Sequence, residues 1–191
     1  MREAVGQFLA GDAAHWVRGA DGVPVKPLLF PGSFNPFHVG HAGLLAAAEE
    51  VSERSGWLEL AVRNADKPAL DTDEVLARLA SLPGALPFVL TKAATFLEKS
   101  EIFPGAWFAM GYDTAVRLLD AQYHADVEGM LERFLALECR FVVAGRLHKG
   151  DYSCLEHLTI APRYRPLFLP ISESLFRKDI SSTQLRGEAG R

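Results

Sequence analysis

A stretch of ten residues, 32–41, combines residue types that suit chemistry on phosphates. Gly32 permits a tight turn and a close approach of the backbone to a ligand. His38 and His41 lie three residues apart, so their rings can face one ligand if a helix begins there. The apolar residues 28–30 precede the stretch. A strand that leads through a glycine turn into a helix directs free N–H groups and the positive end of the helix dipole at one point, which favours a bound polyphosphate.

The two histidines also have less specific interpretations. They could cap the helix or bind a metal, but no third ligand lies near them in the sequence. Their combination with Gly32, Ser33, Asn35 and Pro36 is more specific than either histidine alone and favours the phosphate site.

A second candidate anion site lies near the end of the chain, at residues 179–186. Ser181 and Gln184 fit a capping box, which predicts the start of a helix. Ser182 and Arg186 are four residues apart and would share one helix face. Hydroxyls, free N–H groups and a guanidinium together can bind an anion. A capped terminal helix with an exposed arginine is the alternative.

Two weaker signals follow other apolar runs. Gly111 and Asp113 come after residues 106–110 and could present a carboxylate to ribose hydroxyls, although Asp113 could equally cap a helix. Lys67 and Arg146 could each reach a phosphate, although solvated surface charge is the commoner role for such residues.

The surrounding pattern predicts how these segments are positioned. Apolar runs that predict strands occupy residues 28–30, 57–62, 87–91, 106–111, 140–145 and 166–171. Helical stretches lie between them, at residues 41–54, 72–82 and 125–137. The alternation predicts a Rossmann-like α/β fold, with an open, mostly parallel sheet and helices on both faces. Ligands bind beyond the carboxyl ends of such strands, where the polar segments occur.

The first 26 residues differ from the rest of the chain in their pattern of apolar and polar residues. We expect an N-terminal appendage of residues 1–26 on a main domain of residues 27–191. Residues 3–10 predict a short amphipathic helix. Residues 16–17 and 23–25 flank a turn that could close a hairpin.

Composition sets broad limits on function. The chain has 191 residues, a net charge of −4 and a hydrophobic fraction of 49%, which are typical of one globular domain. No basic block is present, which disfavours nucleic acid as a partner, and no apolar run approaches a membrane span. Cys139 and Cys154 lack metal-ligand spacing and are expected to be free thiols. We therefore expect a cytoplasmic protein with small-molecule substrates; a homo-oligomer is compatible with the sequence.

Two motifs give the chain a family resemblance. Residues 32–41 resemble G-[ST]-F-[DN]-P-x-H-x-G-H, and residues 179–186 resemble D-I-S-S-T-x-x-R. The pair resembles the nucleotidyltransferase superfamily marked by HxGH and SSTxxR motifs, in particular nicotinamide and nicotinate mononucleotide adenylyltransferases. The resemblance extends from about residue 27 to the end of the chain.

The resemblance implies an ATP-dependent enzyme of NAD biosynthesis. It would move AMP from ATP to nicotinamide or nicotinate mononucleotide and release pyrophosphate. Mg²⁺ would be held mainly by the phosphates, with no protein metal site. The implied catalytic residues are His38, His41 and Arg186. The implied nucleotide-binding residues are Gly32, Ser33, Phe34, Gly111, Asp113, Arg146, Ser181, Ser182 and Thr183. The acceptor would contact Asn35, Lys67 and Tyr112.

Some positions depart from the pattern of the nicotinate enzymes. Pro31 stands where a second glycine is common, as in phosphopantetheine-type enzymes, although those usually lack the histidine found here as His38. No tryptophan follows Asp113 to stack on a pyridine, so Tyr112 or Trp107 would have to substitute. A cytidylyltransferase, a phosphopantetheine-type adenylyltransferase and a nucleotide-binding sensor without turnover remain alternatives.

Overall fold

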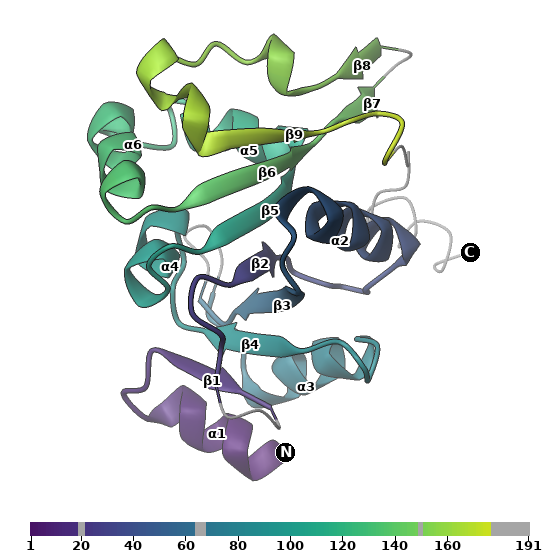
Figure 1. The fold of residues 1–191 in the computed structure, drawn as a ribbon. Coiled ribbons are helices and arrows are strands. Elements are labelled where there is room, and N and C mark those ends of the chain that lie inside the picture. Colours follow the sequence, from purple (N-terminus) through teal and green to yellow (C-terminus); the bar gives the residue numbers. More distant parts are fainter. Residues whose placement is uncertain (19–21, 64–67, 149–150, 177–191) are drawn as a thin grey trace.

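The computed structural model describes residues 1–18, 22–63, 68–148 and 151–176. A seven-stranded sheet forms its centre, with the strand order β1-β4-β3-β2-β5-β6-β9 (Figure 1). The outer strand β1 runs antiparallel to β4, and the other neighbours are parallel. The strands are β1 (His15–Val17), β2 (Leu28–Pro31), β3 (Gly56–Ala61), β4 (Phe88–Thr91), β5 (Trp107–Gly111), β6 (Arg140–Ala144) and β9 (Phe168–Ile171).

Helices cover both faces of the sheet, as predicted. The helices are α1 (Arg2–Ala10), α2 (Val39–Ser52), α3 (Thr72–Ala80), α4 (Phe96–Ile102), α5 (Tyr112–Leu119) and α6 (Val127–Ala136). Apolar residues of α1, α2 and α3 share one core cluster with one face of the strands. Apolar residues of α4, α5 and α6 belong to the cluster on the opposite face (Figure 1). The Rossmann-like α/β prediction is confirmed.

The strand order creates a crevice beside β2. The chain passes from β2 outward to β3 and β4, then returns to place β5, β6 and β9 on the other side of β2. Crossovers that leave neighbouring strands in opposite directions open a space at the carboxyl ends of those strands, where ligands bind in this class of fold. The loop that follows β2 therefore borders both halves of the crevice.

The N-terminal segment joins the main sheet. The helix expected at residues 3–10 is present as α1, but the expected hairpin is wrong. Strand β1 pairs with β4, where His15 lies opposite Thr91, and residues 22–25 form no strand. The uncovered edge of β4 offers unpaired backbone groups, and β1 satisfies them. An ion pair of 2.6 Å between Arg2 and Asp73 also joins α1 to α3.

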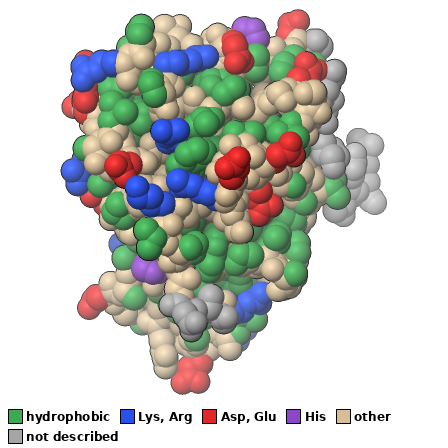
Figure 2. All heavy atoms as spheres, in the orientation of Figure 1, with side chains coloured by type: hydrophobic (Ala, Val, Ile, Leu, Met, Phe, Trp, Pro, Cys, Tyr) green, Lys and Arg blue, Asp and Glu red, His purple; other side chains and the backbone are tan. Residues whose placement is uncertain are grey.

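The connection from β6 to β9 is more elaborate than the sequence suggested. It contains a two-stranded ribbon, β7 (Arg146–His148) and β8 (Asp151–Ser153), followed by the 3-10 helices η1 (Leu155–His157) and η2 (Pro162–Leu167). Both cysteines are free, as predicted. Across the described residues, none of the helices has the length and apolarity that a membrane crossing requires. Basic and acidic side chains are interspersed on the face shown in Figure 2.

Candidate phosphate site and adjoining cavity

The two histidines cap the start of α2 from opposite directions. The Nδ1 atom of His38 accepts a hydrogen bond of 3.1 Å from the Gly40 N–H. The Nδ1 atom of His41 accepts one of 3.2 Å from the His38 N–H. This reciprocal arrangement is a capping box built from imidazoles in place of a hydroxyl and a carboxylate. The capping interpretation is therefore correct for one nitrogen of each ring.

Because both Nδ1 atoms accept hydrogen bonds, the proton of each neutral ring is on Nε2. The rings stack with their centroids 3.7 Å apart. Burial, together with the neighbouring His38 ring, lowers the pKa of His41 to about 4. Burial also lowers the pKa of His38. At neutral pH the pair thus consists of neutral N–H donors rather than imidazolium cations.

Phenylalanine rings hold His41 and the turn before it in place. Phe34 is 1% exposed and has a φ of 43°, in the left-handed region. Its ring lies edge-on to His41, with centroids 5.3 Å apart. A Cβ on Gly32 would lie 2.6 Å from the Phe34 ring, so only glycine fits there without a shift. Since the Phe34 side chain is buried, only the backbone of this predicted nucleotide-binding residue can face a ligand.

Helix α3 and strand β3 fix the backbone of the same loop. The Ser81 hydroxyl, just beyond α3, accepts from the Phe37 N–H at 3.3 Å. It donates its proton to the Arg78 carbonyl at 2.7 Å, with the Phe34 carbonyl at 3.3 Å as a second acceptor. Arg78 donates to the Ser33 carbonyl at 3.3 Å. The Gly32 N–H donates to the Glu59 carbonyl at 3.0 Å. These bonds hold the loop at several points before any ligand binds, and the sequence analysis did not identify Ser81 or Arg78.

A cavity of about 390 Å³ lies beside this loop, over the ends of β2 and β3 and against α3, α4 and α5. The predicted residues Gly32, Ser33 and Asn35 line it. Among the described residues of the lining, the charged side chains are Arg63, Arg78, Lys99 and Glu59. Three cations against one carboxylate suit an anionic ligand.

Glu59 and Lys99 form a buried ion pair in the wall of this cavity. Their side chains are 0% and 6% exposed, and Lys99 Nζ lies 3.4 Å from Glu59 Oε2. The Thr91 hydroxyl donates to the other carboxylate oxygen, Oε1. Burial raises the pKa of Glu59, and the Lys99 ammonium and the Thr91 hydroxyl oppose that rise. In the sequence, the signal for this pair is a charged residue within the apolar run of residues 57–62, which does not indicate its partner.

The remaining described candidates lie on the other side of β2. Gly111 ends β5 and is the N-cap of α5, and Tyr112 is the first residue of that helix. Asp113 lies in the first turn of α5 and forms an ion pair with Arg146, which follows β6. Two residues predicted separately for the nucleotide are therefore in contact. Asp113 is not the helix cap.

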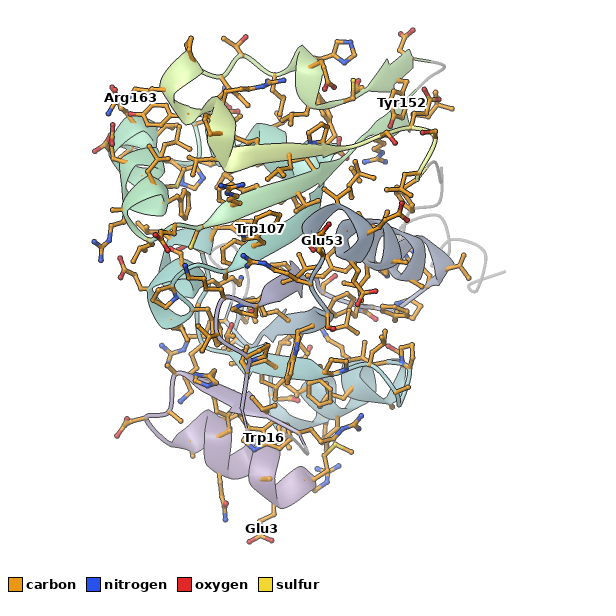
Figure 3. The ribbon with its side chains drawn as sticks, viewed as in Figure 1. Glu3, Trp16, Glu53, Trp107, Tyr152 and Arg163 are labelled. Atoms are coloured by element: carbon orange, nitrogen blue, oxygen red, sulfur yellow. The ribbon has the colours of Figure 1, made fainter. Side chains whose placement is uncertain are left out.

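Some predicted residues are placed elsewhere. Trp107 cannot substitute as a stacking partner in the crevice, because it is the first residue of β5 and so lies at the end of the strands opposite the crevice (Figure 3). There Arg54 and Arg140 stack on its ring, 4.4 and 5.1 Å from the centroid. Five predicted residues lie outside the described residues: Lys67, Ser181, Ser182, Thr183 and Arg186.

Comparison with known proteins identifies a family for most of the chain. Residues 29–188 match the family described as cytidylyltransferase-like, and this range includes both phosphate motifs. No curated protein matches the chain. Among the residues that the structure describes, no three or more His, Cys, Asp or Glu side chains gather as a metal site would require.

Proposed function

The chain belongs to the cytidylyltransferase-like family and is a nucleotidyltransferase, and from that premise we propose that it moves AMP from ATP to a phosphorylated acceptor. The acceptor that we propose is a pyridine mononucleotide, nicotinamide or nicotinate mononucleotide. An oxygen of the acceptor phosphate attacks the α-phosphorus of ATP. The bond from that phosphorus to the bridging oxygen breaks, and pyrophosphate leaves with the electron pair.

The observation that carries this proposal is the pair of imidazoles at the mouth of α2, each with Nδ1 engaged by the backbone. Fixed tautomers place Nε2–H donors beside a helix N-terminus, where phosphate oxygens bind well. The attacking phosphate is already anionic at neutral pH, so no strong base is needed. Catalysis then depends on alignment and on stabilising charge that spreads over the phosphoryl oxygens.

The crevice divides between two substrates in this proposal. ATP takes the β5–β6 side, where Gly111 and Asp113 face its ribose and Arg146 its phosphates. Ser181, Ser182, Thr183 and Arg186 hold the leaving pyrophosphate, a role taken from the family resemblance. The acceptor takes the cavity on the β3 side, whose lining includes Arg63, Arg78 and Asn35, with Lys67 as a further phosphate contact. Tyr112, the remaining residue predicted for the acceptor, begins α5 on the β5 side and is not in the lining of this cavity.

ATP enters as its magnesium complex, with the ion held mainly by the phosphates. The donor set fits this arrangement, because Asp113, the carboxylate proposed for the ATP side, is already paired with Arg146. The ion would neutralise part of the phosphate charge. The residues named above would align the acceptor phosphate with the α-phosphorus of ATP.

The decisive experiment is pyrophosphate release with ATP or CTP across a panel of mononucleotide and other phosphorylated acceptors. We expect release with ATP and a pyridine mononucleotide. A preference for CTP would instead support a cytidylyltransferase, the activity for which the matched family is named. Tight binding of ATP with no release for any pairing would support a sensor without turnover.

A substitution at His41 tests the mechanism within the same assay. His41→Ala removes one donor to the phosphoryl oxygens, so we expect turnover to fall by about two to three decades. His15→Ala is the matched control, since this histidine is exposed in β1. Near-normal turnover in a correctly folded His41→Ala variant would remove this ring from the mechanism.

A further inference from the structure

The cavity contains an ion pair that the phosphate chemistry leaves unused. Glu59 projects from β3 and Lys99 from α4, and both line the cavity. Lys99 Nζ is 3.4 Å from Glu59 Oε2 and 5.6 Å from the centroid of the Phe96 ring. Phe96 lines the same part of the cavity wall. This end of the cavity therefore combines a carboxylate, an ammonium and an aromatic ring.

Stability alone gives a weak reason for such a pair. Removing two charges from water costs several kcal/mol per ion, and apolar residues of similar volume are often as stable or more so. One oxygen of this carboxylate is also incompletely satisfied. Glu59 Oε2 is buried and, within the described part of the chain, has no hydrogen-bond partner. A buried acceptor without a partner is uncommon in folded proteins and indicates a group that a ligand could satisfy.

The position of the pair relates it to one substrate. The residues proposed for ATP follow β5 and β6, whereas Glu59 is in β3, on the other side of β2, and Lys99 reaches it from α4 (Figure 1). The acceptor phosphate has to meet ATP at the loop after β2, next to Ser33 and Arg78. The Glu59 backbone borders that loop, where its carbonyl accepts from the Gly32 N–H. The Glu59–Lys99 pair, however, lies against α4, on the face of the sheet opposite α3 and Arg78. It can thus contact the end of the acceptor that is remote from its phosphate.

We propose that Glu59 and Lys99 read the far end of the acceptor and select a neutral carboxamide over a carboxylate. This inference rests on the proposed function. The ammonium of Lys99 donates to the amide carbonyl oxygen, and the amide N–H donates to Glu59 Oε2. A single group that both accepts and donates matches both members of the pair. A carboxylate would satisfy the ammonium but would bring a second negative charge against Glu59 in a buried site, which is unfavourable.

Nicotinamide mononucleotide and nicotinate mononucleotide are matched probes, because they differ only in this group. For the wild-type protein we expect kcat/KM to favour the carboxamide by about tenfold or more, as for one hydrogen bond to a charged group. In Glu59→Gln the repulsion of a carboxylate is removed, so the preference should fall to within about threefold. Glu101→Gln is the control, because this exposed carboxylate on α4 pairs with Arg133 away from the cavity.

Direct binding gives a second readout. We would titrate both mononucleotides into the intact wild-type and variant proteins by calorimetry, after checking each fold by circular dichroism. If Glu59→Gln does not fold, the double variant Glu59→Gln/Lys99→Met carries the same test without a buried charge. There the preference for the carboxamide should also fall to within about threefold, and both ligands should bind more weakly than to the wild-type protein.

Failure of this inference is distinguishable from failure of the proposed function. A wild-type preference for the carboxylate, an unchanged ratio in Glu59→Gln or binding of neither mononucleotide overturns the role of the pair. Pyrophosphate release with another acceptor in the same panel would leave the nucleotidyltransferase proposal standing. Absence of release with every acceptor, for both ATP and CTP, overturns the two together.

Discussion

The lowered pKa of His41 predicts a measurable loss of stability in mild acid. In the folded protein the pKa is about 4, against 6.5 for an ordinary histidine. As the pH falls below 6.5, the unfolded chain therefore binds a proton that the folded chain does not, and the free energy of unfolding decreases. Below pH 4 the loss is complete and amounts to about 3 kcal/mol. Between pH 7 and pH 5, His41 alone should remove about 2 kcal/mol.

The main physical origin of the loss is the burial of the His41 ring, and the neighbouring His38 ring adds to it. Protonation would also disrupt the cap on α2. Protonation adds a hydrogen to Nδ1, which then cannot accept the His38 N–H, and it places charge beside a helix N-terminus. His41→Gln is the informative variant, because glutamine is a normal partner at this position of a capping box and does not titrate. The His41→Gln variant loses the packing of the imidazole ring at every pH. This loss cancels when the free energies of unfolding at pH 7 and pH 5 are compared within the same variant.

Urea unfolding followed by circular dichroism at pH 7, 6 and 5 measures the effect. Wild type should lose about 2 kcal/mol more than His41→Gln between pH 7 and pH 5. His15→Gln, at an exposed position of the outer strand β1, is the control for replacing a histidine by glutamine. Equal losses in wild type and His41→Gln would show that His41 titrates normally and would refute the neutral-donor description of the site.

Three further substitutions test the loop and its surroundings. Gly32→Ala places a Cβ 2.6 Å from the Phe34 ring, so we expect a loss of about 1–3 kcal/mol in thermal unfolding, with no comparable effect for the uncrowded Gly84→Ala. Ser81→Ala removes the acceptor of the Phe37 N–H and the longer contact with the Phe34 carbonyl, so it should cost about 1–2 kcal/mol, with a fall in kcat that a conservative Ser81→Thr partly restores. Asp113→Asn breaks an exposed ion pair, so unfolding should change by less than about 1 kcal/mol while KM for ATP rises.

Local patterns accounted for most of the fold. Each of the six apolar runs became a strand within about two residues, because strands covered on both faces need side chains of one kind throughout. Helix α4 was missed, although Thr95 and Glu98 form a capping box at its start. The local sequence around β1 does not predict that this strand pairs with β4. This pairing depends on which sheet edge remains open after folding, and a short strand with its own turn signal suits a hairpin equally well.

The candidate site also contains features that local sequence predicts and features that depend on tertiary packing. The segment at 32–41 was predictable because its chemistry is local, with a glycine turn and two cap residues within one helix entrance. The ion pair of Glu59 with Lys99 was not, because its partners are forty residues apart and meet only when α4 packs against β3. A charge inside an apolar run predicts a buried partner but does not say which residue it is.

Neutral histidines suit a reaction in which negative charge shifts among the phosphoryl oxygens while the total charge of the substrates stays the same. Stacked imidazolium rings 3.7 Å apart would repel each other and would bind the triphosphate of the ground state as strongly as the transition state. Neutral Nε2–H donors avoid that repulsion, and their hydrogen bonds strengthen as negative charge shifts among the oxygens around the α-phosphorus. Permanent charge is then best placed where substrates are recognised rather than where bonds change. The cations that line the cavity proposed for the acceptor, Arg63, Arg78 and Lys99, follow this distribution.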